Sequence, residues 1–169
     1  EGNNVLVKTI QVLDPSALPD LVPYRPSGWD GPIVSGGSTG SNYDYAVYDG
    51  ENLYVDFAVI NEGVVNASLV SGRVFVNGEF QRNLTFAGEL EPGFFLSWTA
   101  IDFGVLPQGE YEIEVIWDAF GQVPESDDVN NVYRKTVRVR ENNSEFPDLE
   151  FFRAEGEAYP ASVKSSYIS

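Results

Sequence analysis

An alternation of apolar and polar side chains with a period of two residues is the feature that most constrains the fold of this chain. From Glu110 to Trp117, every second residue is Tyr, Ile, Val or Trp, and three of the residues between them are Glu. Leu, Val, Phe and Val likewise occupy every second position from 53 to 59. Because successive side chains of a β-strand point to opposite faces, this pattern indicates half-buried strands. No segment shows the periodicity of an amphipathic helix, so we predict an all-β protein.

Turn signals separate the predicted strands at short intervals. The clearest is Asn77-Gly78, which lies between the apolar residues 74–76 and Phe80 and predicts a two-residue hairpin. Similar signals occur at 61–63, 91–93 and 107–109. The predicted strands are 21–24, 51–60, 69–76, 80–86, 94–100, 110–117 and 131–139. Short strands punctuated in this way are typical of an immunoglobulin-like antiparallel β-sandwich.

Composition excludes several classes of function. The formal net charge of −16, from 26 acidic and 10 basic residues, argues against binding to nucleic acid or to an anionic membrane. Cys, Met and His are absent, which excludes disulfides, thiol nucleophiles and His-dependent catalysis. We predict no catalytic and no organic-cofactor residues; a carboxylate pair of the glycosidase type is the one catalytic alternative. No apolar run approaches the ~20 residues that a membrane-spanning helix needs.

The segment 25–50 has a different composition from the predicted strands around it. It is rich in Gly, Ser, Tyr and Asp, and we interpret it as an insertion between the first two strands of the sandwich. Four aromatic residues in it, Trp29, Tyr43, Tyr45 and Tyr48, leave two interpretations open. Their rings either stack on sugars, as in a carbohydrate-binding module, or fold over the sandwich or into a subunit interface.

Carboxylates and amides gather between Trp117 and Asn131. This stretch contains Asp118, Glu125, Asp127, Asp128, Asn130 and Asn131, and it contains no Lys or Arg. Two carboxylates ~4 Å apart repel by about 4 kcal/mol at an effective dielectric constant of ~20. A hard cation such as Ca²⁺, which takes six to eight oxygen ligands, removes that repulsion. The alternative is a solvated acidic turn without a metal.

The order of these signals resembles the CARDB family of immunoglobulin-like domains from bacterial and archaeal surface proteins. The residues that carry the resemblance are 19–21, 61–63, 74–78, 90–93, 109–111, 117–118 and 125–131, so it covers roughly residues 19–140. Asp128 stands where the family usually has Glu, and the insertion at 25–50 departs from the family's compactness. The resemblance implies a seven-stranded sandwich without catalysis, in an extracellular adhesive or structural role.

In the topology that this resemblance implies, the start of the first strand and three acidic loops meet at one end of the sandwich. We therefore add Asp20 and Glu62 to the candidate ligands. The full predicted calcium set is Asp20, Glu62, Asp118, Glu125, Asp127, Asp128, Asn130 and Asn131.

Two tails extend beyond the predicted sandwich. Residues 1–18 include the β-branched, apolar run 5–13, and residues 141–169 form a C-terminal extension in which 147–149 repeats the Pro-Asp-Leu of 19–21. Each tail is expected to add a strand. The first either packs on its own sandwich or adds to the sheet edge of a neighbouring subunit as a donor strand. The donor side chains are then Val5, Val7, Ile10 and Val12.

The apolar run 5–13, the junction 13–21 and the acidic loop together resemble the subunits of archaeal cannulae. These are hollow extracellular tubes of hyperthermophiles whose assembly depends on calcium. The resemblance implies a structural subunit that polymerises head to tail with copies of itself, with related subunits or surface glycans as further partners. The alternative is a cell-surface adhesion or carbohydrate-binding module.

Three tripeptides fit the acceptor pattern for N-glycosylation, at Asn66, Asn83 and Asn142. The chain begins at Glu1 and not at Met. Both observations lead us to expect an exported, mature protein.

Overall fold

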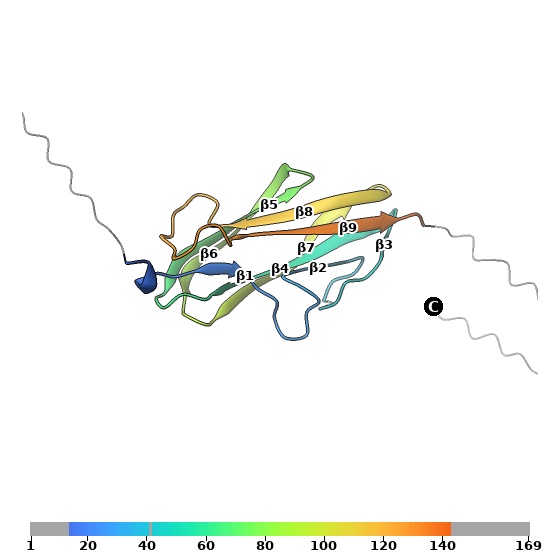
Figure 1. Ribbon diagram of the computed structural model, residues 1–169. Helices are drawn as coiled ribbons and strands as arrows, with labels where there is room; N and C mark the ends of the chain where they lie inside the picture. The colour runs from blue at the N-terminus through green and yellow to red at the C-terminus, as the bar shows by residue number, and fades with distance from the viewer. Residues whose placement is uncertain (1–13, 41, 143–169) are drawn as a thin grey trace, which may run out of the picture.

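The computed structural model describes residues 14–40 and 42–142 of the 169 residues (Figure 1). These residues form a short 3₁₀ helix, η1 (Pro15–Ala17), and nine strands. The strands are β1 (Leu21–Pro23), β2 (Ile33–Gly36), β3 (Val47–Tyr48), β4 (Asn52–Asn61), β5 (Ala67–Val76), β6 (Glu79–Leu90), β7 (Phe95–Val105), β8 (Gly109–Trp117) and β9 (Val132–Arg140). The predicted donor run 5–13 and the C-terminal extension beyond residue 142 lie outside the described residues.

The strands form two sheets that face each other, which confirms the predicted all-β sandwich. In the first sheet, β4 pairs with β7 along one edge, while β1 and β2 pair one after the other with its opposite edge. The second sheet has the order β3-β9-β8-β5-β6. All of these pairs are antiparallel except the two-residue strand β3 with β9, which run parallel.

Each of the seven predicted strands is present, with shifts of at most a few residues at its ends. The hairpin at Asn77-Gly78 is confirmed: both residues have positive φ, 50° and 80°, as a tight turn between right-twisted strands requires. The segment 25–50 contributes a strand to each sheet, β2 to the first and β3 to the second. It is therefore built into the sandwich along part of its length.

The core lies between the sheets and is filled by the inward residues of the alternating strands. Phe57, Val74 and Ile113 are fully buried, and Trp117 is buried as its place in the alternation predicted. The Trp117 ring stacks on Trp98 of β7, with 5.2 Å between the ring centroids. Trp98 thus faces the core.

A second, smaller apolar cluster lies on the outer face of the first sheet. Trp29, Val34 and Ala58 are buried there, and Tyr24 packs against them. Of the two interpretations left open for Trp29, folding over the sandwich is confirmed, because only 6% of its surface is exposed. Tyr43 and Tyr45 are more than half exposed, at 54% and 57%.

Gly72 in β5 allows Trp117 to pack flat against the sheet. A Cβ atom at position 72 would lie 2.6 Å from the Trp117 ring, far inside van der Waals contact. We predict that Gly72→Ala lowers the free energy of unfolding by about 1–3 kcal/mol, the usual cost of overpacking a core. Chemical denaturation followed by Trp fluorescence measures this change.

Gly109→Ala is the matched control. Its Cβ would meet the Tyr111 ring at an ordinary 3.5 Å, and Gly109 also lies in a strand. Equal unfolding free energies for the two variants would show that the close approach at Gly72 is not a packing constraint.

Candidate metal centre

Four segments meet at one end of the sandwich, and we call this end the acidic pole: residues 18–21, 61–66, 90–94 and 117–131. Backbone hydrogen bonds join them. Glu62 N donates to Asp20 O at 2.7 Å, Gly93 N to Asn61 O at 2.7 Å, and Ser126 N to Pro19 O at 2.9 Å. The predicted convergence of the acidic loops is therefore confirmed (Figure 1).

The buried Asn61 side chain holds three of these segments together. Its Oδ1 accepts hydrogen bonds from Asp20 N and Gly63 N, and its Nδ2 donates to Val65 O and Leu90 O. These bonds use both amide hydrogens and both lone-pair directions of the oxygen. Asn61 therefore organises the pole and is not a metal ligand. The sequence placed Asn61 at the pole but carried no signal for this role.

The candidate ligand Asp118 has its two carboxylate oxygens directed at its own loop. Oδ1 accepts from Gln122 N at 2.9 Å, and Oδ2 accepts from Val123 N at 2.8 Å. The residue is buried and has a positive φ of 40°. Asp118 thus shapes the start of the β8–β9 loop.

Glu125 is the most perturbed acid of the pole. Its side chain is buried; Oε1 accepts from Leu21 N at 2.5 Å, and Oε2 accepts from Asn131 Nδ2 at 2.6 Å. Burial raises the pKa of the Glu125 carboxyl from its ordinary 4.5 to about 7. The negative charges of Asp118 and Asp128 add to this rise in pKa, while the two hydrogen bonds oppose it.

Two buried amide oxygens lie beside these acids without a donor. Asn130 Nδ2 donates to Asp20 Oδ1 at 3.0 Å, and Asn131 Nδ2 donates to Glu125 Oε2. The Oδ1 atoms of both asparagines are buried and have no hydrogen-bond partner among the described residues. A buried acceptor left unsatisfied costs about 1–3 kcal/mol, so this arrangement suits a cation that takes oxygen ligands.

The eight predicted ligands thus separate into three groups. Hydrogen bonds pair Asp20 with Asn130 and Glu125 with Asn131, and Leu21 N, next to Asp20 in the chain, donates to Glu125. We call these four residues the inner cluster: Asp20, Glu125, Asn130 and Asn131. Asp118 is directed at its own loop. Glu62, Asp127 and Asp128 are exposed, and we call them the rim.

Carboxylates alone do not make a metal centre here. In residues 14–40 and 42–142, no three acids are grouped so that they could hold a metal ion. A cation at this pole would therefore need oxygen ligands besides carboxylates, and the amide oxygens of Asn130 and Asn131 are candidates. In the same part of the chain, no helix is long and apolar enough to cross a bilayer.

Comparisons with known proteins identify the fold. A family model described as CARDB matches residues 33–135. A crystal structure of a CARDB domain from Pyrococcus furiosus, in complex with di-metal ions, has a TM-score of 0.56 and 22% sequence identity, and the match covers 74% of this chain and 96% of that one. A solution structure of the same domain gives a TM-score of 0.54 at 22% identity, covering 73% and 96% of the two chains. No curated protein matches the chain.

The raised pKa of Glu125 predicts the pH dependence of the metal-free protein. Between pH 4.5 and 7 the folded protein holds a proton that the unfolded chain has released, so stability falls as the pH rises. We expect the free energy of unfolding to drop by on the order of 3 kcal/mol over this range, in the presence of a chelator. Urea denaturation at several pH values measures it.

Glu125→Gln should remove this fall, because the variant has no proton to lose. Glu112→Gln, at an exposed position of β8, is the control and should retain it. A wild-type stability that rises between pH 4.5 and 7 by the same amount as in Glu125→Gln would contradict the prediction.

Proposed function

The chain belongs to the CARDB family, and we propose that it is a non-catalytic structural subunit of an extracellular filament or tube, whose copies join head to tail. CARDB domains are cell-surface domains. The finer proposal has three parts: a donated N-terminal strand, an acceptor edge on the sandwich, and calcium at the acidic pole. In this assignment, residues 1–18 are the donor segment, 19–140 the sandwich with its insertion at 25–50, and 141–169 the C-terminal extension.

The observation that carries the proposal is the incompletely covered side of the sandwich at β6 and β7. Each is the edge strand of its sheet among the described residues, and Arg82 Nη2 of β6 donates to Asp102 O of β7 across this side. The inward side chains here pack on the core yet are only partly buried. They are Phe86, Leu96, Trp98, Ile101 and Phe103.

An added apolar strand would complete this side. Unpaired sheet edges bind extended segments through backbone hydrogen bonds, and alternate side chains of the segment then enter the core. β7 has positive φ values at Ala100 and Gly104, which interrupt its edge. The 12-residue strand β6 is therefore the better acceptor of backbone hydrogen bonds.

The N-terminal run supplies a suitable donor. Val5 and Val7 share one face of a regular strand and Ile10 and Val12 the other, so a β-bulge at 8–9 is needed for all four to enter the same side. Burial of four apolar side chains contributes roughly 6–12 kcal/mol before ordering costs. The segment leaves the domain at the acidic pole, because only Leu18 separates η1 from Pro19. Donation from one copy to the next is head to tail, and such a contact builds a filament when it does not close.

Calcium fits the inner cluster best among common metals. Its donors are oxygens of Asp20, Glu125, Asn130 and Asn131, and the chain has no Cys or His to favour a transition metal. A bound cation would satisfy the two amide oxygens and neutralise charge where subunits meet. The three glycosylation candidates, Asn66, Asn83 and Asn142, are exposed, which agrees with an extracellular location.

A carbohydrate-binding or adhesion module is the second candidate. Tyr43 and Tyr45 are exposed beside one another in the segment 25–50, where they line a shallow depression with Thr39 and Asn42. Aromatic faces with polar neighbours are suited to sugars. This candidate requires no self-association, which separates it from the filament.

Deletion of residues 1–12 tests strand donation. The shortened protein should stay folded, because it retains both sheets and the core between them, but it should remain monomeric under conditions in which the full chain assembles. Sedimentation velocity and negative-stain electron microscopy measure assembly. Deletion of residues 143–169 is the control and should leave assembly intact; assembly of the 1–12 deletion would contradict donation of this strand.

Calcium binding is tested by the increase in stability that it produces. At a calcium concentration 100 times the Kd, the free energy of unfolding should rise by about 2.7 kcal/mol. Asp20→Asn and Glu125→Gln should reduce this increment, whereas Asp127→Asn on the rim should retain it. Melting curves with calcium and with a chelator measure the increment, and identical curves for the wild type would exclude the site.

A further inference from the structure

The few basic side chains of this acidic protein are unevenly distributed. The described residues contain seven of them, and four lie on the single strand β9. These four are Arg134, Lys135, Arg138 and Arg140. The concentration of positive charge on one strand distinguishes it from the rest of a chain with a formal net charge of −16.

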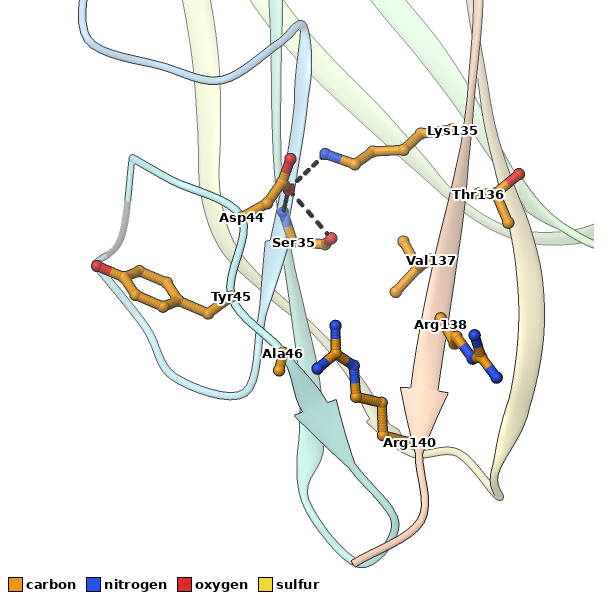
Figure 2. A pocket seen from close by; sticks show the side chains of 9 residues that line it. All are labelled: Ser35, Asp44, Tyr45, Ala46, Lys135, Thr136, Val137, Arg138 and Arg140. Atoms are coloured by element: carbon orange, nitrogen blue, oxygen red, sulfur yellow. Dashed lines mark hydrogen bonds and ion pairs between the residues drawn. The ribbon is translucent and has the colours of Figure 1, made fainter.

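A cleft of about 240 Å³ lies between β9 and the segment from β2 to β3 (Figure 2). Lys135 closes one side of it. Its ammonium group forms an ion pair with Asp44 and donates to Ile33 O at 2.8 Å. Asp44 also accepts from Ser35 N, so the one carboxylate in the lining is already neutralised and hydrogen-bonded.

Arg138 and Arg140 both line this cleft, and Figure 2 shows the Arg138 guanidinium on the far side of β9 from Ala46. Neither guanidinium group forms an ion pair or hydrogen bond with any described residue, although Glu110 lies opposite Arg138 in the strand register. Arg134, by contrast, pairs with Glu114. Figure 2 shows Arg140 reaching from the end of β9 toward Ala46. Among the described residues, neither of these two guanidinium groups therefore has a counter-ion.

The cleft and the acidic pole lie at opposite ends of the sandwich. β9 begins directly after Asn131 at the pole and ends at Arg140, and its nine residues span about 30 Å. One end of the molecule thus presents the exposed carboxylates of the rim, Glu62, Asp127 and Asp128, and the other presents two arginines that have no ion pair among the described residues. Figure 1 shows β9 running between these two ends. The arginine end also exposes Asp49, Glu51, Glu110 and Glu141, so the complementarity is local to the two guanidinium groups and is satisfied when the rim of one copy meets them head to tail.

We propose that Arg138 and Arg140 bind rim carboxylates of a second copy of this chain, so that the acidic pole of one copy docks at the cleft of the next. The cleft is smaller than the roughly 300–1,000 Å³ of sites for drug-sized ligands, but it admits a carboxylate, which arginine binds in a bidentate manner. Contacts between two acidic poles would juxtapose like charges and are disfavoured. This inference rests on the proposed head-to-tail assembly and assigns the polar contact that sets its direction.

Neutralisation of the two arginines is the first test. In the full chain, Arg138→Gln/Arg140→Gln should raise the protein concentration needed for assembly at least tenfold, as measured by light scattering and sedimentation velocity. Added salt should weaken assembly of the wild type more than that of the variant. Arg134→Gln is the matched control, because that residue lies on the same strand but already has a partner, and it should assemble like the wild type.

A charge swap then identifies the partner. Glu62→Lys/Asp127→Lys and Arg138→Glu/Arg140→Glu should each prevent assembly, and the four substitutions combined in one chain should restore it. A cooperative thermal unfolding transition confirms that each variant is folded. If Arg138→Gln/Arg140→Gln does not fold, Arg140→Gln alone replaces it. Restoration by the combined substitutions supports the docking of rim on cleft.

The outcomes separate this inference from the proposed function. A wild type that assembles together with a double Gln variant that assembles equally well would overturn the docking contact and leave the filament intact. The docking contact would also be overturned if the double Gln variant lost binding to free phosphate or to a sulfated polysaccharide but still assembled. That result would assign the cleft to the anion. A wild type that stays monomeric would overturn both.

Discussion

The burial of the Glu125 carboxylate among other acids is the constraint on which the acidic pole depends. Its two oxygens join β1 to the β8–β9 loop through Leu21 and Asn131, so the carboxylate fastens the first strand to the last loop. The same burial places negative charge where Asp118 and Asp128 oppose it, which raises its pKa. The pole can resolve this conflict by taking up a proton or, as we propose, a cation.

The alternation of side chains predicted much of the fold, because burial of one face imposes a period of two on every long strand. Local sequence correctly predicted β8 and the hairpin at Asn77-Gly78, because at both places the local conformational preference agrees with the tertiary structure. The alternation did not reveal β2 and β3, because strands of four and two residues are too short to display a period of two. The sequence left the burial of Trp29 open, because this burial depends on a segment folding back over the sheet.

The candidate site was predictable in its location but not in its chemistry. Topology brought the acidic loops to one end, as the order of strands required. The direction of each carboxylate, however, is set by loop backbone: Asp118 bonds its own loop, while Glu125 reaches β1. The unsatisfied oxygens of Asn130 and Asn131 become visible only once these bonds are known.

In the proposed assembly, the donor segment leaves from the acidic pole, and the arginine cleft receives that pole at the opposite end, so both contacts require the same head-to-tail order. The most direct test of this account is negative-stain electron microscopy of the full chain with millimolar Ca²⁺ and with a chelator. Filaments or tubes that form with calcium and are absent with the chelator are the predicted result. Monodisperse monomers in both conditions would contradict the account and favour a stand-alone adhesion or sugar-binding domain.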